Sequence, residues 1–452
     1  MSGIIVEFLK LAEVFHKNNY GIYLDLGYEI KSDKRKFFQP YIEENKLFPS
    51  YINLIKTLKK PFYNYSASLI EEILHVVTQN NPSILKKYAH IIENYSDYIA
   101  DKLIHLWNKL NINIVVVENG TLPENIIFTK ALYKAIAQYG QQHQFKKYVI
   151  WRDHDLMWSS ESNINKYGRR PYPNVPKILP SEFISFIVLH HADYGEVLKW
   201  SPKANISILR NNFNIPSPLK KLDHSERLQI RNYFRSQYNI PNEGHLLARF
   251  TRIIPQKRID RDIYLLHLLH QQCKIENKSL NICLAIAGNQ NENIIESLRL
   301  KNLITKFQLN NHVIFTGELK PIGFTTNNFE KSISSLIIAC DLCSFLTSYH
   351  YESFGNPISE SILLDRFFIT TSYKRYQHVY GDMGYKSLVF SISDQKDHLI
   401  TEEFASEVYE LLNNEKKRNK VIRHNRTIME SKQKNDLPLF EKLNQLLDVK
   451  LS

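Results

Sequence analysis

Cysteine is scarce in this chain, with four residues among 452, which is too few for a disulfide-stapled scaffold. Cys340 and Cys343 form a CxxC pair, a spacing also found in zinc and redox sites. No second CxxC or nearby histidine pair completes a metal site. The surrounding stretch LIIACDLCSFLTS, residues 336–348, is typical of a buried strand in which cysteine acts as a small apolar residue. We therefore expect no metal and no disulfide here.

Long apolar runs are also missing. Nothing approaches the roughly 18 consecutive apolar residues of a transmembrane helix. The first residues, MSGIIVEFLKLAEVF, lack the basic start of a signal peptide and contain Glu7, Lys10 and Glu13. No repeat or low-complexity tract is present, and 43% hydrophobic with 23% charged residues is ordinary for a globular protein. These features predict a cytoplasmic protein.

Acidic residues are outnumbered, and the formal charge is +12. Residues 1–220 carry 27 Lys and Arg against 20 Asp and Glu, and the remainder carries 31 against 26. Such a field suits an anionic partner, namely a nucleotide diphosphate, an anionic membrane face or a nucleic acid. A solvated basic surface without a partner is an equal alternative. No nucleic-acid motif or Lys/Arg stripe is present, so we expect no nucleic acid.

Strands and helices alternate along the chain. At about 150 residues per domain, the chain is long enough for two or three domains. Hydrophobic periodicity and β-branched runs such as IVVVEN predict the elements of the first half. The expected helices are 4–15 and 125–138, and the expected strands are 21–27, 114–119, 147–155, 182–190 and 206–210.

The alternation pauses at residues 211–222, NNFNIPSPLKKL, and then restarts. Beyond this linker we expect strands at 245–253, 280–288, 311–319 and 334–346, and a helix at 261–272. Two α/β halves predict two doubly wound, Rossmann-like sheets facing each other across a cleft. The predicted domains are 1–215 and 216–430, followed by a C-terminal helix within 431–452 that packs back toward the first domain.

The stretch YESFGNPISE, residues 351–360, suggests a binding site at the end of the last of these strands. Asn356 fits a helix N-cap and Pro357 the first helical position. The helix would direct its unpaired N–H groups at an anion, and Gly355 would let a ligand approach the backbone. Glu360, one turn into the helix, could bind paired hydroxyls such as those of a ribose, with Glu352 nearer the other end of the ligand.

Other strand ends supply further candidates, since ligands of open α/β sheets gather at the carboxyl ends of strands. Arg252 and Lys257 follow the first strand of the second half and could neutralise a diphosphate. Gly288 follows the next strand, and Ser348 follows the strand that leads to Glu352. Glutamates eight apart and surface cations also occur by chance. The joint order on successive strand ends is more specific than any one of them.

This order resembles the Glu-x7-Glu signature of retaining glycosyltransferases with the GT-B fold, in the nucleotide-sugar-dependent family 4. In the second half the matching segments are ARFTRIIPQKRIDRDIYLL, LAIAGNQ, HVIFTGEL and ACDLCSFLTSYHYESFGNPISESILLDRFFITTSY. In the first half they are VVVENGTLPENIIFTKALYKAIA and VIWRDHDLMWSSES. The resemblance covers most of residues 110–430, and its donor-side motifs are more specific than its acceptor-side motifs.

The resemblance implies a hexosyltransferase that takes a hexose from a UDP- or GDP-sugar. Glu360 would hold the ribose hydroxyls. Glu352 and the backbone of residues 354–356 (Phe354, Gly355, Asn356) would hold the sugar and phosphates, while Arg252 and Lys257 stabilise the departing diphosphate. His154 would face the transferred sugar. The implied chemistry is independent of metal ions and cofactors. A donor phosphate oxygen would take the acceptor proton, so no dedicated protein base is required.

Histidine roles remain open from the residues alone. His154 lies in a DHD run at a strand end and could equally cap neighbouring backbone. The same spacing mimics the metal-binding Asp-x-Asp of another glycosyltransferase fold, a reading that this architecture disfavours. We interpret His190, His191 and His350 as structural.

The chain departs from the family at its start, because the family opens with a strand and a glycine-rich loop that are not seen before the helix at 4–15. The first domain is therefore expected to lack its first strand. This leaves an inactive relative that serves as a binding or scaffold subunit as the alternative function. Otherwise we expect a glycan or lipid-linked acceptor, with peripheral contact to an anionic membrane face.

Overall fold

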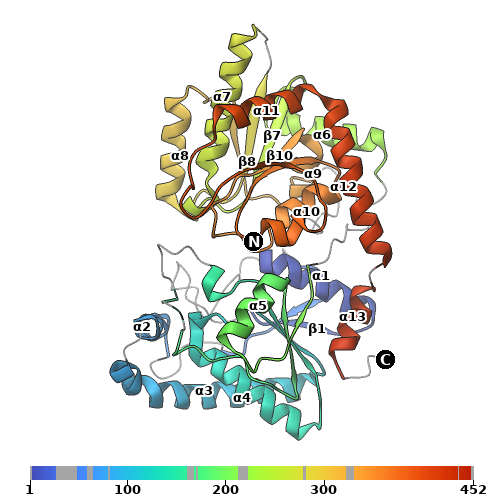
Figure 1. Ribbon diagram of the computed structural model, residues 1–452. Coiled ribbons are helices and arrows are strands. Elements are labelled where there is room, and N and C mark those ends of the chain that lie inside the picture. Colours follow the sequence, from blue (N-terminus) through green and yellow to red (C-terminus); the bar gives the residue numbers. More distant parts are fainter. Residues whose placement is uncertain are drawn as a thin grey trace. The chain divides into compact units, whose positions relative to one another are not determined.

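The structure is a computed structural model of the chain (Figure 1). It describes residues 3–26, 48–58, 65–79, 82–159, 167–168, 170, 172–211, 222–277, 281–321, 330–435 and 437–448. Contacts divide the chain into a first unit, residues 7–212 with 437–452, and a second unit, residues 213–436 with 1–6. The predicted linker falls mostly at 212–221, outside the described residues.

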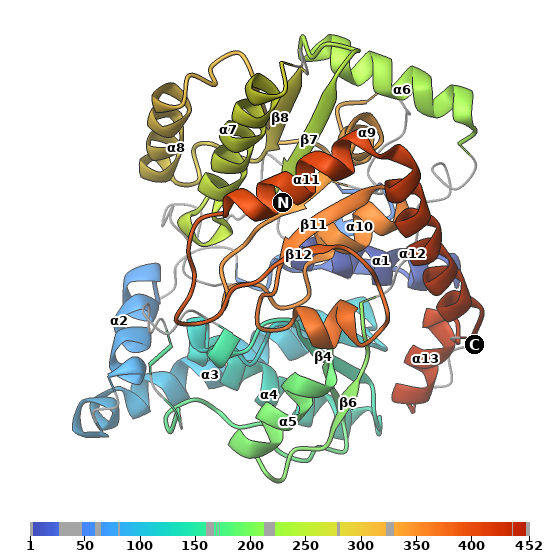
Figure 2. The same ribbon diagram turned by 45° about the horizontal axis from the view of Figure 1, so that its top comes forward.

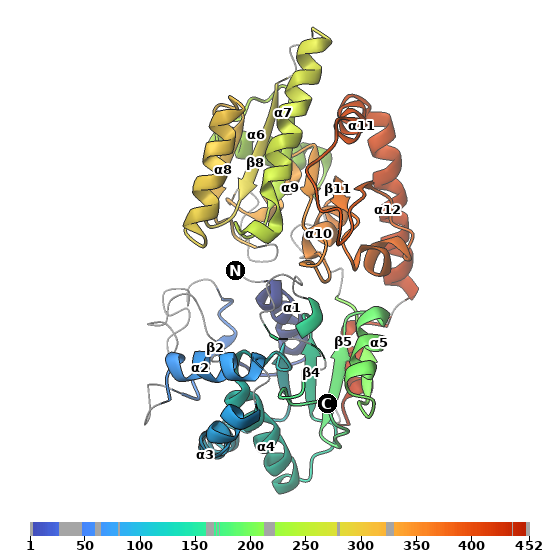
Figure 3. The same ribbon diagram turned by 60° about the vertical axis from the view of Figure 1, so that its left-hand side comes forward.

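The first unit is built on the parallel sheet β3-β4-β5-β6, beside a separate parallel pair, β1-β2. It contains most of α1 (Gly3–Lys17), and β1 (Ile22–Leu24), β2 (Ile52–Leu54), α2 (Ala67–Thr78), α3 (Pro82–Leu110), β3 (Val115–Glu118), α4 (Ile126–Gln142), β4 (Val149–Asp153), β5 (Ile184–Val188), α5 (His191–Trp200), β6 (Ile206–Ile208) and α13 (Leu439–Leu446). The long helix α3 runs along α4 (Figures 1 and 3).

The end of the chain belongs to the first unit. The Ser185 hydroxyl of β5 donates to the Leu446 carbonyl of α13 at 2.5 Å. The Asp448 amide donates to the Lys147 carbonyl at 3.0 Å, and the Phe15 ring of α1 meets the Phe440 ring edge-on. Helix α13 is therefore held by backbone, hydroxyl and aromatic contacts within this unit.

The second unit is built on one parallel sheet in the order β12-β11-β10-β7-β8-β9. Its elements are α6 (His224–Gln237), β7 (His245–Phe250), α7 (Ile259–Ile275), β8 (Ile282–Ala287), α8 (Ile294–Lys306), β9 (Val313–Gly317), α9 (Ile333–Ala339), β10 (Leu342–Phe345), α10 (Asn356–Leu363), β11 (Phe367–Thr371), β12 (Leu388–Phe390), α11 (Glu402–Asn413) and α12 (Glu415–Asn435).

The strand order of the second sheet reverses once. The chain runs outward from β7 to β9, then returns to β10 beside β7 and runs outward again to β12. Helix α7 packs against α8 and α11, whereas α6 packs against α9, and α10 against α12 (Figure 2). The reversal creates a switch point between the carboxyl ends of β7 and β10, where ligands of doubly wound sheets bind.

Arginines secure the opposite, amino edge of this sheet. Arg231 and Arg235 of α6 donate to the Ala339 carbonyl at the end of α9 and pair with Asp341. Arg366 donates to two further carbonyls of α9. Carbonyls at a helix C-terminus lack intrahelical partners, and cations there also complement the helix dipole. These three arginines of the second unit therefore have structural partners.

The predicted α/β fold is confirmed, and the expected strands of both halves coincide with β1, β3 to β6 and β7 to β9. The single strand predicted at 334–346 is wrong in its first half. Residues 333–339 form α9, started by the Ser332 hydroxyl, which accepts from the Ser335 amide at 3.1 Å. A short buried apolar run fits either element, and the serine cap decides for the helix.

Because residues 333–339 are helical, the two cysteines of the CxxC pair lie between a helix and a strand rather than within one strand. Cys340 comes directly after α9 and Cys343 lies in β10, with their sulfurs 3.5 Å apart. All four cysteines are buried free thiols. Within the described ranges, no helix is long and apolar enough to cross a membrane.

Candidate functional site

The turn that leads into α10 depends on Gly355. Its φ of 78° is left-handed, and a Cβ there would lie 2.7 Å from the Tyr373 hydroxyl, so both conformation and space require glycine. The prediction of Asn356 as N-cap is wrong by one residue. Gly355 is the cap and Pro357 is the second helical residue, because the left-handed glycine lets the helix begin at Asn356. Gly355 itself has no side chain that could cap this helix start.

Two buried tyrosines donate hydrogen bonds to the backbone of this turn. The Tyr373 hydroxyl donates to the Phe354 carbonyl at 2.9 Å, and the Tyr380 hydroxyl donates to the Gly355 carbonyl at 2.8 Å. Burial, together with the nearby charge of Glu352, raises the pKa of both hydroxyls well above the usual value, so they remain protonated donors. Tyr380 lies in a π-helical turn, Gln377–Gly381, a feature often found at functional sites.

Lys257 and Glu352 form the central ion pair. The Lys257 Nζ lies 2.6 Å from the Glu352 Oε2, with side chains 12% and 19% exposed. The same ammonium lies 4.9 Å from the centre of the Tyr351 ring. Arg252 reaches the Tyr351 hydroxyl at 3.3 Å but also pairs with Glu292. The structure therefore brings three predicted residues, Arg252, Lys257 and Glu352, around Tyr351.

A second ion pair, which the sequence did not indicate, lies beneath Lys257. Arg249 of β7 and Asp262 of α7 are almost fully buried, with Nε and Oδ2 3.6 Å apart. Arg249 also donates to the Ser344 carbonyl at 3.0 Å and to the Lys257 carbonyl at 2.5 Å. Burial lowers the pKa of Arg249 and raises that of Asp262. The pair ties the Lys257 turn to β7 and β10.

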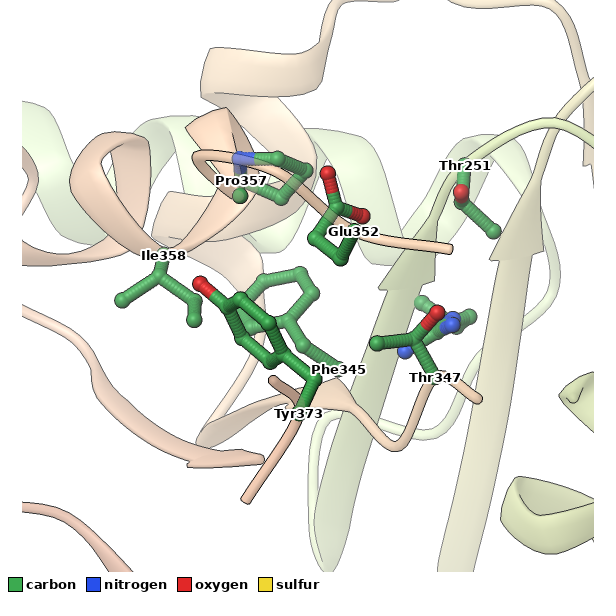
Figure 4. Close-up of a pocket in the computed structure, with 9 residues that line it drawn as sticks. Thr251, Phe345, Thr347, Glu352, Pro357, Ile358 and Tyr373 are labelled. Carbon is green, nitrogen blue, oxygen red and sulfur yellow. The ribbon is translucent and has the colours of Figure 1, made fainter. Parts of the chain in front are cut away.

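A pocket opens at the switch point (Figure 4). It is lined by Arg249, Thr251, Phe345, Thr347, Glu352, Gly355, Pro357, Ile358 and Tyr373. In Figure 4, Thr251 and Thr347 mark the β7 and β10 side, while Pro357 and Ile358 mark the first turn of α10. The pocket therefore joins two strand ends to the glycine-capped start of a helix, an arrangement that suits an anionic ligand.

Three further predicted donor-side residues, Ser348, Gly288 and Glu360, are not among the residues that line this pocket. The Ser348 amide donates to the Gln256 carbonyl at 3.1 Å and so joins the loop after β10 to the Lys257 turn. Gly288 packs on β7, where a Cβ would lie 2.2 Å from the Thr251 carbonyl oxygen. Glu360 is on the buried side of α10. Close strand packing alone thus explains a glycine at 288.

In the first unit, His154 belongs to a buried polar cluster at the end of β4. Its Nε2 lies 2.8 Å from the Glu118 carboxylate, which also accepts two hydrogen bonds from Arg152, at 3.1 and 2.8 Å. Since a carboxylate only accepts, the His154 Nε2 carries the proton. Burial raises the pKa of Glu118, but Arg152 and His154 outweigh it and the pKa lies below its usual value. Sequence reasoning missed Glu118, which lies 36 residues away.

The two aspartates beside His154 point to separate partners. Asp153 is buried and accepts from the amide and hydroxyl of Thr121 at 3.2 and 2.5 Å. Burial raises its pKa to about 6, against the lowering effect of the Thr121 bonds. Asp155 contacts Asn119. In the part of the chain that the structure describes, no group of three His, Cys, Asp or Glu side chains could hold a metal ion.

Two of the other histidines make structural contacts. The His190 Nδ1 caps α5 by accepting from the Asp193 amide at 3.3 Å, and its Nε2 lies 2.8 Å from the Asp193 carboxylate. His350, near the Glu352 turn, pairs with Asp394 at 2.6 Å.

Comparisons with known proteins agree with this architecture. Residues 231–427, which include Arg252 to Glu360, match the family model "Glycosyl transferases group 1". A search of curated protein sequences finds no match.

Several solved structures are similar over nearly the whole chain. WaaG, described as a glycosyltransferase involved in lipopolysaccharide biosynthesis, has a TM-score of 0.59 at 13% identity, covering 99% of this chain and 96% of that one. Sucrose-phosphate synthase of Thermosynechococcus elongatus has a TM-score of 0.60 at 12% identity, covering 98% and 94%. HepE of Anabaena, in complex with UDP and glucose, has a TM-score of 0.53 at 14% identity, covering 94% and 96%.

At these identities the structural likeness shows the fold, which is that of the GT-B glycosyltransferases. The family match covers the sheet that carries the switch-point pocket and the Lys257–Glu352 pair. The match over residues 231–427, together with this fold, therefore indicates a glycosyltransferase.

Proposed function

We propose that this chain is a retaining glycosyltransferase that moves a hexose from a UDP- or GDP-sugar to a glycan or lipid-linked acceptor. The observation that carries the proposal is the Lys257–Glu352 pair beside the Gly355 turn that starts α10, at the switch point of the matched domain. Residues 216–430 would serve as the donor-binding domain and residues 1–215 as the acceptor-side domain.

The diphosphate would bind at the start of α10, where backbone N–H groups and the helix dipole favour negative charge. Lys257 and Arg252 would add cationic charge from the Tyr351 side. Glu360 would hold the ribose hydroxyls, and Glu352 with residues 354–356 would hold the sugar. Ser348 and Gly288 would keep the surrounding loops in place through their backbone contacts.

The transfer would break the bond between the sugar C1 and the diphosphate oxygen, and the electron pair would leave with the diphosphate. The acceptor oxygen would bond to C1 on the same face, and its proton would pass to a phosphate oxygen of the leaving group. Lys257 and Arg252 would stabilise the negative charge that develops there. These cations make a metal ion and a cofactor unnecessary in the proposal.

His154 would contact the transferred sugar. Since Glu118 holds Nε2, Nδ1 is the ring nitrogen that this ion pair leaves to a sugar hydroxyl, as an acceptor when the ring is neutral. Glu118 and Arg152 would then act as positioning residues for His154.

The named relatives support the choice of substrates. The Anabaena structure contains UDP and glucose, which favours a uridine nucleotide and a hexose. The role of WaaG in lipopolysaccharide biosynthesis favours a glycan acceptor on a lipid. Because such acceptors lie at a bilayer, we include peripheral contact with an anionic membrane face, on the cytoplasmic side.

The test is a turnover assay of the full chain with a panel of UDP- and GDP-sugars, with and without EDTA. We expect slow hydrolysis of one donor that persists in EDTA, with retention of the anomeric configuration in the first-formed sugar by NMR. Glu360→Ala should abolish it, whereas Glu410→Ala, an exposed glutamate on α11, should not.

Inversion at C1 would overturn the retaining assignment. Nucleotide binding without turnover of any donor, even with lipid and glycan extracts as acceptors, would favour the inactive scaffold. No nucleotide binding at all would overturn the donor site itself.

A further inference from the structure

The first five residues of α8 include three exposed aliphatic side chains, Ile294, Ile295 and Leu298, which we call the apolar tip. Their exposed fractions are 62%, 82% and 55%. Leu298 lies four positions after Ile294 and three after Ile295, the spacings at which side chains on a helix are neighbours, so Leu298 joins the three into one patch. Single exposed apolar residues are ordinary, whereas a contiguous exposed group marks an interaction surface.

The apolar tip lies outside the face of α8 that packs against the core. Leu300 and Ile304 are buried against the rest of the unit, and Leu300 belongs to the core that includes α7 and β8. Figure 1 shows α8 beside α7, at the outside of the second unit. The helix therefore carries one apolar face inward and a second apolar group outward.

The outward face turns cationic after the tip. Arg299, Lys301 and Lys306 are exposed. The one carboxylate of the helix, Glu296, is buried and pairs with Arg299 at 2.7 Å. Lys301 and Lys306 therefore present positive charge with no acidic residue of α8 exposed beside them.

The spacing of these groups fits a bilayer surface. At about 1.5 Å per residue, Lys301 lies roughly 9 Å along the helix from Ile295. Apolar faces of interfacial helices enter the boundary between headgroups and acyl chains by about 5–10 Å. With α8 meeting the bilayer by its N-terminal end and the apolar tip at that depth, Lys301 and Lys306 would lie at or above the phosphates.

The apolar tip lies at the same edge of the second sheet as the switch-point pocket. Helix α8 follows β8, so its first turn lies at the carboxyl edge of the second sheet, the same edge that carries the switch-point pocket. A membrane contact here would hold the pocket edge of this unit close to the bilayer.

We propose that the apolar tip of α8, with Lys301 and Lys306 behind it, docks on an anionic lipid surface. The proposal names the surface for the membrane contact included above and rests on that part of the proposed function, but not on the identity of the donor. The combination of exposed aliphatic residues with lysines, on a helix that exposes no acidic residue of its own, favours an anionic bilayer over a neutral or acidic protein surface.

The test is flotation of the full chain with vesicles of phosphatidylglycerol and phosphatidylcholine, and with phosphatidylcholine alone. The variant is Ile294→Ser combined with Ile295→Ser. The matched control is Ile275→Ser, an isoleucine 75% exposed at the far end of α7. We expect at least tenfold weaker binding to the mixed vesicles for the double variant and unchanged binding for the control.

A charge variant separates the two contributions. Lys301→Gln with Lys306→Gln should weaken binding to the mixed vesicles and reduce its sensitivity to salt, while leaving the weak binding to phosphatidylcholine unchanged.

Three results would overturn the proposal. One is equal flotation of the wild type and the double isoleucine variant. Another is a concentration-dependent dimer that dissociates in the variant, which would assign the tip to a second copy. The third is a loss of thermal stability in the variant, which would mean that the tip is covered within the chain. UDP binding, measured on the same samples, reports the donor site separately, so failure of one proposal does not imply failure of the other.

Discussion

Individual residues at the switch point differ in how far the sequence could predict them. Lys257 and Glu352 lie on motifs with a chemical rationale, and the structure places them 2.6 Å apart. The tyrosines behind the turn could not be predicted in the same way. Tyr373 and Tyr380 contact carbonyls 19 and 25 residues away, and only the fold brings these atoms together. Glu118 was missed for the same reason.

Tyr373→Phe removes the hydroxyl that binds the Phe354 carbonyl and leaves that oxygen without this donor. We expect a loss of about 1–2 kcal/mol in unfolding free energy and weaker UDP binding, because the turn at Gly355 is less rigid. Calorimetric melting and UDP titration check this. Tyr376→Phe, in the same aromatic cluster, is the control. Equal UDP affinity in both variants would contradict a positioning role for Tyr373.

Lys257→Met retains much of the side-chain volume but removes the charge that faces Glu352. If Lys257 stabilises the leaving diphosphate, kcat should fall by roughly 10²–10³-fold while the fold is retained. Lys420→Met, an exposed lysine on α12, should leave the rate unchanged. A variant with normal kcat and only a raised KM would limit Lys257 to ground-state binding.

Asp153 predicts a pH dependence in the first unit. Burial raises its pKa from 3.8 to about 6, so the folded state binds the proton more tightly than the unfolded state does. Its contribution to stability is therefore full below about pH 4 and is lost as the pH rises through 6. About two pKa units correspond to roughly 3 kcal/mol.

The test compares wild type with Asp153→Asn between pH 4 and 7. All four tryptophans (Trp107, Trp151, Trp158 and Trp200) lie in the first unit, so their fluorescence in urea reports its unfolding. The asparagine can still bind the Thr121 amide and hydroxyl. We expect the wild type to lose more stability than the variant over this range, and parallel pH profiles would refute the assignment.

At the scale of elements, parallel strands were the most predictable part of the molecule. Runs such as IVVVEN at 114–119 are apolar on both faces, as strands buried between helices must be, and the structure has β3 there. Helix starts were less predictable. Both α9 and α10 begin where a local cap decides: a serine hydroxyl in one case and a left-handed glycine in the other.

Gly355→Ala tests the start of α10. The alanine would have to adopt φ near 78° with its Cβ 2.7 Å from the Tyr373 hydroxyl, at a cost of at least about 1–2 kcal/mol. UDP affinity should fall together with the calorimetric melting temperature of the second unit.

Gly195→Ala is the matched control. It lies inside α5, where a Cβ would meet nothing within 4 Å, and it should stabilise the first unit by about 0.5–1 kcal/mol. Unchanged UDP binding in Gly355→Ala would show that this turn does not contact the nucleotide.

At the scale of the whole molecule, the two units divide the predicted site residues between them. The donor-side candidates, from Arg252 to Glu360, are in the second unit, and His154 is in the first. Two sheets could be predicted from the sequence because each half repeats the alternation of strand and helix. The family match covers only the second sheet. It therefore supports the proposed donor site and does not address the acceptor.

The measurement that tests the central claim most directly is hydrogen exchange of the full chain with and without saturating UDP. The account predicts slower exchange at residues 249–257 and 347–363, around the Lys257–Glu352 pair and the start of α10, and the loss of this protection in Glu360→Ala. Protection confined to residues 114–125 and 149–158 in the first unit, with none around α10, would contradict it.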